Sequence, residues 1–446
     1  MRGFRSTLIL LVIFLGLLGY IYFYVMKKPS GPEASVEQKQ KVFTVESDKI
    51  EELLVKSATG ERTLVRKMNG TWEIVEPRPA KADESEVTGM VTNLASLEIQ
   101  RVVDDNPGDI VQYGLAPPHV EIGFRKAGEK DPTLIYLGDK TATGTDLYAK
   151  RPNEKRVFLV SSFLDTTFNR NTFDLRDKTI LKFDRDKADS IDVVSKDQTL
   201  KLAKSGAQWN LVAPLAARAD VTSAEGLVGR LQTAQMKSIA VEDVAQKDLA
   251  TYGLDKPAIT ATVNTGSARA TLALGNADDE GNLYARDMAR AMVFTVEKAL
   301  ADDLNKKASE YRPKEIFEFR PFTATRIEIA WGAVTVAFEK TKGKDGQETW
   351  RQITPAKVVE GAKVDALLSA FSGLTVDKYV DATTKTGTDS PVAIVTVKFD
   401  DGKKEERVAF GKVDKDMFAG RAGEPGAAQI VAAKFDEALK ALDALK

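Results

Sequence analysis

Alternating apolar and polar residues recur in three blocks along this chain, and each block opens with the same strand pattern. In the middle block, Ile191 and Val193, then 200 and 202, alternate with polar residues on either side of the turn at 195–198. This period of two across a short polar turn predicts a β-hairpin. Corresponding hairpins are expected around 59–61 and around 332–333. Each block therefore begins with antiparallel strands.

A helical pattern follows each hairpin. Apolar residues recur every three or four positions in 87–97, 227–231 and 364–374, which predicts one amphipathic helix per block. Two capping pairs are expected at the starts of these helices: Asp83 with Glu86, and Thr222 with Glu225.

A shorter helix is expected to end at Tyr113-Gly114-Leu115 and again at 252–254, because glycine suits the left-handed position after a helix. The third block has Thr386-Gly387-Thr388 instead. Further strands and a short closing helix complete each block, and the closing helix at 435–445 is predicted to be the longest.

The three blocks are copies of one unit. Trp72, Trp209 and Trp350 are 137 and 141 residues apart, and each is followed closely by a proline. Downstream, Leu137-Gly138-Asp139 recurs at 274–276 and at 410–412. The sequence predicts an α+β fold with an N-terminal transmembrane helix and three homologous, mainly antiparallel repeat units. The expected repeats are 42–178, 179–314 and 315–446, each of ordinary domain size.

The N-terminus carries the second strong signal. Residues 7–26 contain no charged side chain, and as a helix they span about 30 Å, the thickness of a hydrocarbon core. The apolar run is longer than a cleaved secretory signal requires, and Lys27-Lys28-Pro29 replaces a cleavage site. We expect a cytoplasmic tail at 1–6, an uncleaved signal anchor at 7–26 and a flexible linker at 27–41. The rest is expected outside the cytosol of a bacterial cell, in the periplasm, anchored to the inner membrane.

Composition excludes several functions. The chain has no cysteine, one histidine and a net charge of −1. Disulfides, thiolate metal sites and a cysteine nucleophile are therefore excluded, and the charge favours no nucleic-acid partner. No phosphate-binding glycine loop, calcium loop or serine elbow is present. We predict no catalytic, cofactor-binding or metal-binding residues, and no enzyme activity.

The remaining candidates have simpler structural interpretations. His119 has no motif that supplies an orienting partner, and the second copy has Ile259 at this position. The tryptophans suggest glycan binding, but aromatic residues at matching strand positions are more often core anchors. Asp139, Asn276 and Lys412 differ in chemistry, so their position is expected to be a turn.

Two arginines stand at the ends of the first and second copies. Arg176 and Arg312 occupy equivalent positions there, and we expect them to make hydrogen bonds between units.

These motifs resemble a bacterial family catalogued as domain of unknown function 4340. The resemblance covers residues from about 42 to 312 through Trp72, Tyr113-Gly114-Leu115, Gly138, Tyr148 and their second-copy partners. The third copy departs by losing Tyr-Gly-Leu. The resemblance implies single-span envelope proteins, often encoded beside gliding-motility-type ABC transporter components, and it supplies no catalytic residues.

Three functional hypotheses follow. The first is a membrane-anchored scaffold that partners an ABC-type transport complex. The second is an envelope module that binds lipid or glycan, and the third is a hydrolase of unknown substrate. Neither the partner nor a ligand is specified by the sequence.

Overall fold

The computed structural model of the chain describes residues 40–342 and 347–445. The predicted tail, the predicted transmembrane helix at 7–26 and most of the predicted linker lie outside these ranges. Within them, none of the helices combines the length and apolar composition needed to cross a membrane. The chain divides into two compact units, residues 1–178 and 179–446.

The first repeat is built on a nine-stranded antiparallel sheet. Its strand order is β4-β3-β2-β1-β6-β7-β8-β9-β5. The edge strand β5 therefore pairs with β9, although it precedes β6 to β9 in the sequence. The strands are β1 Ile50–Lys56, β2 Arg62–Met68, β3 Thr71–Glu76, β4 Ala80–Lys81, β5 Arg101–Asp104, β6 Val120–Lys126, β7 Thr133–Lys140, β8 Asp146–Lys150 and β9 Val157–Ser161. The helices are η2 Ser47–Lys49, α2 Glu84–Ala95, η3 Val111–Tyr113 and α3 Phe163–Phe168.

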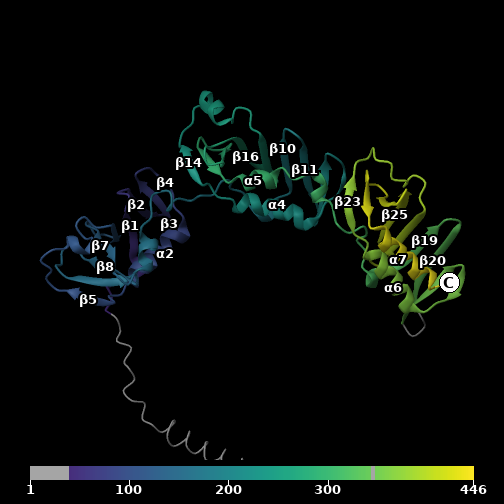
Figure 1. The fold of residues 1–446 in the computed structure, drawn as a ribbon, viewed down its shortest axis with the longest axis horizontal. Coiled ribbons are helices and arrows are strands. Elements are labelled where there is room, and N and C mark those ends of the chain that lie inside the picture. The colour runs from purple at the N-terminus through teal and green to yellow at the C-terminus, as the bar shows by residue number, and fades with distance from the viewer. Residues whose placement is uncertain (1–39, 343–346, 446) are drawn as a thin grey trace, which may run out of the picture. The chain divides into compact units, whose positions relative to one another are not determined.

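The second repeat has a sheet of the same order, β13-β12-β11-β10-β15-β16-β17-β18-β14. Its strands are β10 Ser190–Ser195, β11 Thr199–Ser205, β12 Gln208–Ala213, β13 Ala217–Arg218, β14 Ser238–Val241, β15 Ile259–Thr265, β16 Ala268–Ala277, β17 Leu283–Asp287 and β18 Val293–Val296. Its helices are η4 Arg185–Lys187, α4 Val221–Thr233, η5 Gln246–Tyr252, α5 Lys298–Leu304 and η6 Ala308–Tyr311. Figure 1 shows α4 and α5 lying together against this sheet.

The third repeat repeats the order as β22-β21-β20-β19-β24-β25-β26-β27-β23. Its strands are β19 Ala324–Trp331, β20 Val334–Lys342, β21 Glu348–Thr354, β22 Ala356–Val358, β23 Val376–Val380, β24 Ala393–Phe399, β25 Lys404–Val413, β26 Asp416–Arg421 and β27 Ala427–Ile430. Its helices are η7 Pro321–Thr323, α6 Gly361–Ser372 and α7 Ala432–Asp443. Three sheets with one strand order confirm the predicted antiparallel repeats.

The repeated tryptophans anchor the cores. Trp72, Trp209 and Trp350 are all buried, so their rings are not available as platforms for a sugar. In the second and third repeats the indole N–H donates to an acidic residue of the helix that covers the sheet. Trp209 donates to Glu225 at 2.7 Å, and Trp350 donates to Asp365 at 3.0 Å. These bonds fasten the helix to its sheet.

One of the two predicted helix caps is wrong. Asp83 caps α2 as expected, because its carboxylate accepts from the backbone N–H groups of Ser85 and Glu86. In the second repeat, however, the N-cap is Asp220, which accepts from the N–H of Ser223. Thr222 is already inside α4, and Glu225 binds the indole of Trp209 instead of capping the helix. An aspartate two residues earlier supplies the same acceptor, so the predicted pair is not needed.

The Leu-Gly motif is a strand position, which corrects the prediction of a turn at Asp139, Asn276 and Lys412. These residues lie in β7, β16 and β25. A Cβ on Gly138 would lie 2.1 Å from the carbonyl oxygen of Tyr113. The left-handed glycine that ends η3, Gly114, brings this carbonyl against the strand. The two glycine motifs are therefore halves of one contact.

Two further predictions concern the ends of the repeats, one of which needs a small correction. Gln40 and Lys41, at the end of the predicted linker, already pair with the chain after α2, through Ile99 and Glu98. The closing helix is longest in the third repeat, as predicted, with 12 residues in α7 against 6 in α3 and 7 in α5.

Candidate functional site

His119 forms part of a surface ion cluster. Its Nε2 atom lies 3.9 Å from a carboxylate oxygen of Asp165, and Lys140 approaches the other oxygen at 3.1 Å. Among the described residues, no serine or threonine hydroxyl is hydrogen-bonded to this imidazole. Asp165 therefore supplies the acidic partner that no sequence motif indicated, but the pair lacks a nucleophile to activate.

Metal binding has no support in the same part of the chain. Across residues 40–342 and 347–445, no group of three or more histidine, aspartate or glutamate side chains is placed to hold a metal ion.

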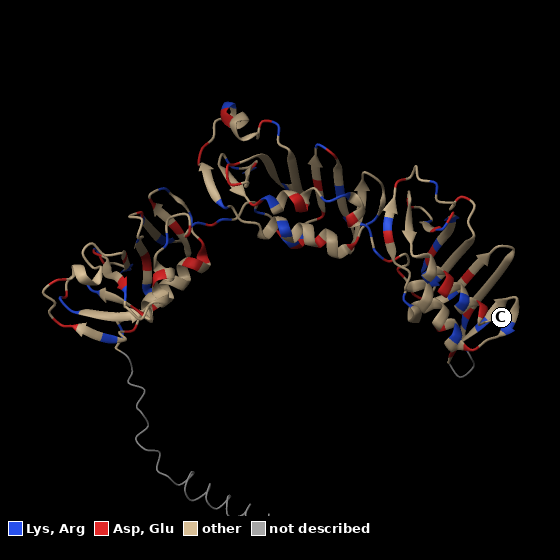
Figure 2. Ribbon diagram, in the orientation of Figure 1, with Lys and Arg blue, Asp and Glu red and all other residues tan. Residues whose placement is uncertain are grey.

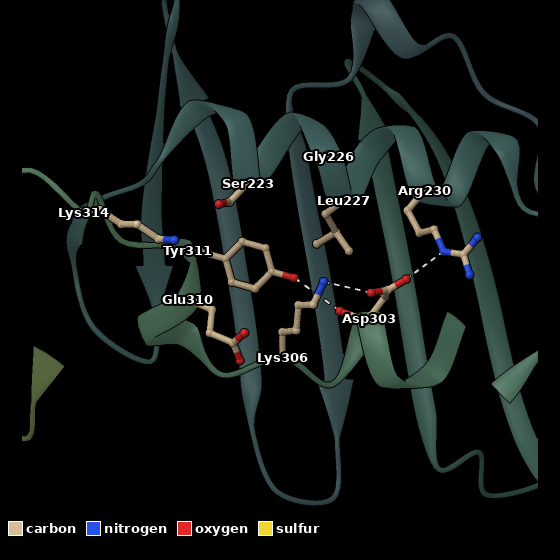
Figure 3. A pocket seen from close by; sticks show the side chains of 9 residues that line it. All are labelled: Ser223, Gly226, Leu227, Arg230, Asp303, Lys306, Glu310, Tyr311 and Lys314. Carbon is tan, nitrogen blue, oxygen red and sulfur yellow. Dashed lines mark hydrogen bonds and ion pairs between the residues drawn. The ribbon is translucent and has the colours of Figure 1, made fainter. Parts of the chain in front are cut away.

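A groove in the second repeat lies between α4, the end of α5 and η6 (Figure 3). Its volume is about 500 Å³, which falls in the range of ligand and peptide sites. Leu227 and the ring of Tyr311 give it apolar walls, and Gly226 exposes the backbone of α4 at its edge. The lining residues are Ser223, Gly226, Leu227, Arg230, Asp303, Lys306, Glu310, Tyr311 and Lys314.

Charges of both signs line this groove. Asp303 accepts from Arg230 at 2.8 Å and from Lys306 at 2.8 Å, and Arg230 also binds Glu297. The hydrogen bond from Lys306, followed by that from Arg230, lowers the pKa of Asp303 despite partial burial. Asp303 is thus ionised, and Arg230 and Lys306 balance its negative charge within the protein. Lys314 is exposed and has no ion pair with any other described residue.

Tyr311 forms the innermost wall of the groove. Burial is the main cause that raises the pKa of its hydroxyl far above the ordinary value. The hydroxyl donates to the backbone carbonyl of Asp303 at 3.4 Å, while the backbone carbonyl of Tyr311 accepts from Asp220. A phenol held neutral in this way acts as a packing and hydrogen-bonding group, and not as a general base.

The first repeat has a groove at the same place. A hollow of about 220 Å³ lies between α2 and α3. Gly89, Met90 and Asn93 line it where Gly226, Leu227 and Arg230 line the second groove. Gly89 follows Trp72 by the same number of residues as Gly226 follows Trp209. Beyond Asn93 a second hollow of about 150 Å³ runs past the end of α2 to Phe163, which is 55% exposed.

The third repeat has a helix at the equivalent place. In the first two repeats the closing helix stops at Phe168 or Leu304. In the third, α7 continues to Asp443, and Leu442 of α7 and Leu445 just after it are buried in the core that also contains Leu367 of α6. The end of α7 reaches β22, where Lys357 Nζ contacts the carbonyl oxygen of Leu445.

A buried ion cluster lies between the second and third repeats. Glu424 binds Arg218 at 2.7 Å and Arg312 at 3.1 Å. Arg218 also binds Glu318 at 2.9 Å. Burial raises the pKa of Glu424, but the three nearby arginines, Arg218 first, outweigh it and lower the pKa overall.

The cluster bears on the prediction for Arg176 and Arg312. Arg312 makes the expected contact across repeats, through Glu424. The backbone of Arg176 forms a bridge to Ala82 and donates its N–H to the carbonyl of Phe173, both within the first repeat. The sequence did not single out Arg218 or Glu424, because neither belongs to a repeated motif.

A further hollow of about 350 Å³ lies in the third repeat. It forms where Thr386-Gly387-Thr388 replaces Tyr-Gly-Leu. In the other repeats the tyrosines of this motif pack on a second tyrosine, Tyr148 or Tyr284, at 4.9 and 5.0 Å between ring centroids. Polar side chains including Asp381, Arg407 and Arg421 line the hollow. Its lining differs from that of the grooves along α2 and α4.

The grooves along α2 and α4 were not predicted. A signal for them is present in the sequence: each helix has a glycine, Gly89 or Gly226, at the same interior position. Nothing lies within 4 Å of where a Cβ would be at either glycine. Internal packing therefore does not require these glycines, although glycine destabilises a helix interior by about 1 kcal/mol relative to alanine.

Comparison with solved structures finds weak similarity to bacterial sliding clamps. A DNA polymerase sliding clamp from Pseudomonas aeruginosa, crystallised with a ligand, is 8% identical, with 88% of this chain and 93% of that chain covered and a TM-score of 0.16. A DNA polymerase III subunit beta from the same organism gives 7% identity, 85% and 90% coverage and a TM-score of 0.17. The sliding clamp of Bartonella birtlesii is 9% identical, with 88% of this chain and 93% of that chain covered and a TM-score of 0.14. Superposition this poor carries no conclusion about fold or activity.

Comparison with curated proteins finds no match. A family profile, in contrast, matches most of the chain in two overlapping segments, residues 72–220 and 209–391. The segments begin at Trp72 and Trp209, the residues that open the repeated strand in the first two copies. The chain belongs to the family described as Domain of unknown function (DUF4340).

Proposed function

We propose that this protein is a non-enzymatic accessory subunit that acts by contact. In this proposal a single N-terminal helix, 7–26, anchors it in the bacterial inner membrane, and the three repeats extend outside the cytosol. Its partner is an ABC-type membrane transport complex of the gliding-motility type. The observation that carries the proposal is the recurrence of one groove at the same place in two copies of one fold.

Recurrence favours contact over chemistry. A catalytic site needs convergent groups with different roles, which duplication of a whole domain does not supply. A binding surface gains from duplication, because two sites on one chain raise avidity. Acidic and basic residues are interspersed along each repeat (Figure 2), as in a general protein-contact surface.

The membrane and transporter parts of the proposal rest on the sequence. An uncharged segment of membrane-spanning length precedes a polar linker, and such an arrangement places a domain near a membrane. The resemblance of the repeats to single-span envelope proteins encoded beside ABC transporter components supplies the partner class.

A ligand-binding module is the second candidate, because the groove volume of about 500 Å³ suits a small molecule. Its charged rim of Arg230, Lys306, Glu310 and Lys314 favours a polar ligand over a lipid chain. Native mass spectrometry of the purified protein distinguishes the two candidates: a stoichiometric bound metabolite supports the module, and an unliganded chain supports the accessory subunit. No observation in the described part of the chain supports a hydrolase.

Co-purification tests the proposal. The full chain with a C-terminal tag is extracted from native membranes in a series of detergents, from mild to harsh. We expect the integral-membrane and ATPase subunits of one transporter to be recovered in the mild detergents. A matched control carries the tag on an unrelated single-span periplasmic protein. Recovery of the chain alone in every detergent contradicts the proposal.

A further inference from the structure

We infer that the grooves along α2 and α4 each bind an amphipathic helix of the partner protein. This inference rests on the proposed function, and it identifies the binding surface and the kind of segment that occupies it. Three observations carry it: the helix present at this place in the third repeat, the exposed glycines of the first two, and the charges of the rim.

The third repeat shows what fits against the long helix. The apolar residues of α7 recur at helical spacing, and they pack with α6 in one core. They are Phe435, Ala438, Leu439 and Leu442, and Leu445 just after the helix joins the same core. Ala370 of α6 and Ala441 of α7 also pack against this core, and small residues allow two helices to approach closely. The third repeat thus already packs a second helix, α7, against its long helix α6.

The first two repeats lack that neighbour. In the second repeat the chain leaves the helix at Asn305, the C-cap of α5, and in the first at Asn169, the C-cap of α3. The chain then turns through η6 in the second repeat, so the four-residue 3-10 helix η6 lies beside α4 where α6 has the end of α7. The groove is the space that remains.

The glycines suit a close helix partner. Gly226 and Gly89 are exposed on their helices, and a Cβ at either position would contact nothing within 4 Å. A residue without a side chain lets another backbone approach the helix directly. The groove touches α2 from Ser85 to Asn93, a length of about 13 Å, and its extension passes the end of that helix to reach Phe163.

The rim specifies the charge of the occupant. Asp303 is already neutralised by Arg230 and Lys306, whereas Lys314 has no ionic partner in the described part of the chain. An occupant of the second groove therefore presents an apolar face to Leu227 and Tyr311. It presents an acidic residue toward Lys314 and a basic residue toward Glu310, whose carboxylate accepts only the backbone N–H of Lys307 in the described part of the chain. Binding of an amphipathic helix in a groove through such spaced anchors is a common mode of recognition.

Site-directed crosslinking tests the inference, because the chain has no cysteine of its own. Single variants Gly226→Cys and Gly89→Cys, each labelled with a benzophenone maleimide, are photolysed in membranes that contain the complex. The control is Gln232→Cys, an exposed position on another face of α4. We expect both groove variants to crosslink to a partner segment with apolar residues at helical spacing, and the control not to do so. Crosslinks to lipid, glycan or a non-helical segment overturn the inference.

Groove-filling variants separate this inference from the proposed function. Because the space beside each glycine is open, Gly226→Trp and Gly89→Trp fill the grooves without disturbing the fold, which circular dichroism verifies, and Gly226→Ala is the matched control. We expect the double tryptophan variant to lower recovery of the partner at least about tenfold, as for loss of an interface anchor. If the partner is recovered equally with the double variant, the inference fails and the proposed function stands. If no partner is recovered even with the wild type, the proposed function fails.

Discussion

The guanidinium of Arg312 lies over the ring of Tyr379, 3.7 Å from its centroid. The same guanidinium donates to Glu424 at 3.1 Å, and the Tyr379 hydroxyl donates to the backbone carbonyl of Pro313 at 2.7 Å. Burial raises the pKa of Tyr379, so the ring remains neutral under the cation. A desolvated cation over an aromatic ring contributes about 2 kcal/mol. The end of the second repeat is thereby fixed to the third.

Removing the charge at Glu424 is predicted to destabilise this connection. In Glu424→Gln the arginines Arg218 and Arg312 lose a buried carboxylate, and breaking a buried ion pair typically costs about 3–5 kcal/mol. We expect the calorimetric transition of residues 179–446 to move to lower temperature and that of the first repeat to stay unchanged. Since several units unfold, the transitions must be resolved separately.

The matched control is Glu405→Gln, which breaks the exposed pair between Lys398 and Glu405. Exposed pairs contribute about 0–1 kcal/mol, so little change is expected. Equal destabilisation by the two variants contradicts a special role for the buried cluster.

The stability of residues 179–446 is predicted to fall in acid through Glu424. Its folded-state pKa is below the ordinary value of 4.5, so its contribution is present above that value and is lost as the pH falls through the folded pKa. Glu406 opposes this change, because burial raises its pKa and protonation therefore relieves a cost. We expect the stability difference between the wild type and Glu424→Gln, measured by urea unfolding, to shrink below about pH 4.5. A difference that stays constant from neutral pH to about pH 3 refutes this assignment.

Alanine at two glycines of the first repeat is predicted to have opposite effects. Gly138→Ala places a Cβ 2.1 Å from the carbonyl oxygen of Tyr113, and the shift needed to relieve the clash is expected to cost about 1–3 kcal/mol. Gly89→Ala adds a methyl group in open space on a helix and is expected to stabilise by about 1 kcal/mol. Thermal unfolding of the two variants shows whether each substitution lowers or raises the stability. Stabilisation by Gly138→Ala is the result that disproves the contact.

The third repeat is predicted to depend on α7 for stability. Leu442 is 2% exposed and packs with α6, and Leu442→Ala is expected to cost about 2–5 kcal/mol. Phe163→Ala, at an exposed residue of the first groove, is expected to change stability by less than about 0.5 kcal/mol while weakening partner recovery. Chemical unfolding and co-purification of both variants give the comparison, and a stability loss in Phe163→Ala weakens the assignment of this ring to binding.

Local signals predicted much of the fold. The hairpin from Ile191 to Leu202 follows from alternation between neighbouring residues. The left-handed Gly114 follows from a glycine after a short helix, and the cap at Asp83 from an acidic residue before an apolar run. All of these depend on residues close in sequence. The cap of α4 was assigned to the wrong residue because Asp220 and Thr222 both qualify by local criteria.

Contacts between distant residues were not predictable in this way. The contact between Gly138 and the Tyr113 carbonyl joins strand β7 to the short helix η3, which the sequence does not show to be neighbours. The grooves depend on where the chain turns after Asn169 and Asn305, and the ion cluster joins Arg218 to Glu424 across two repeats. A single sequence specifies the residue types at these sites but not which of them meet.

Crosslinking in living cells tests the central claim, contact with a membrane transport complex, most directly. A membrane-permeable, lysine-reactive crosslinker is applied to cells that express the full chain, and the linked peptides are identified by mass spectrometry. The account predicts links from lysines near the second groove, such as Lys306 and Lys314, to one subunit of a membrane transporter. Links only within the chain, or only to cytosolic proteins, would contradict it.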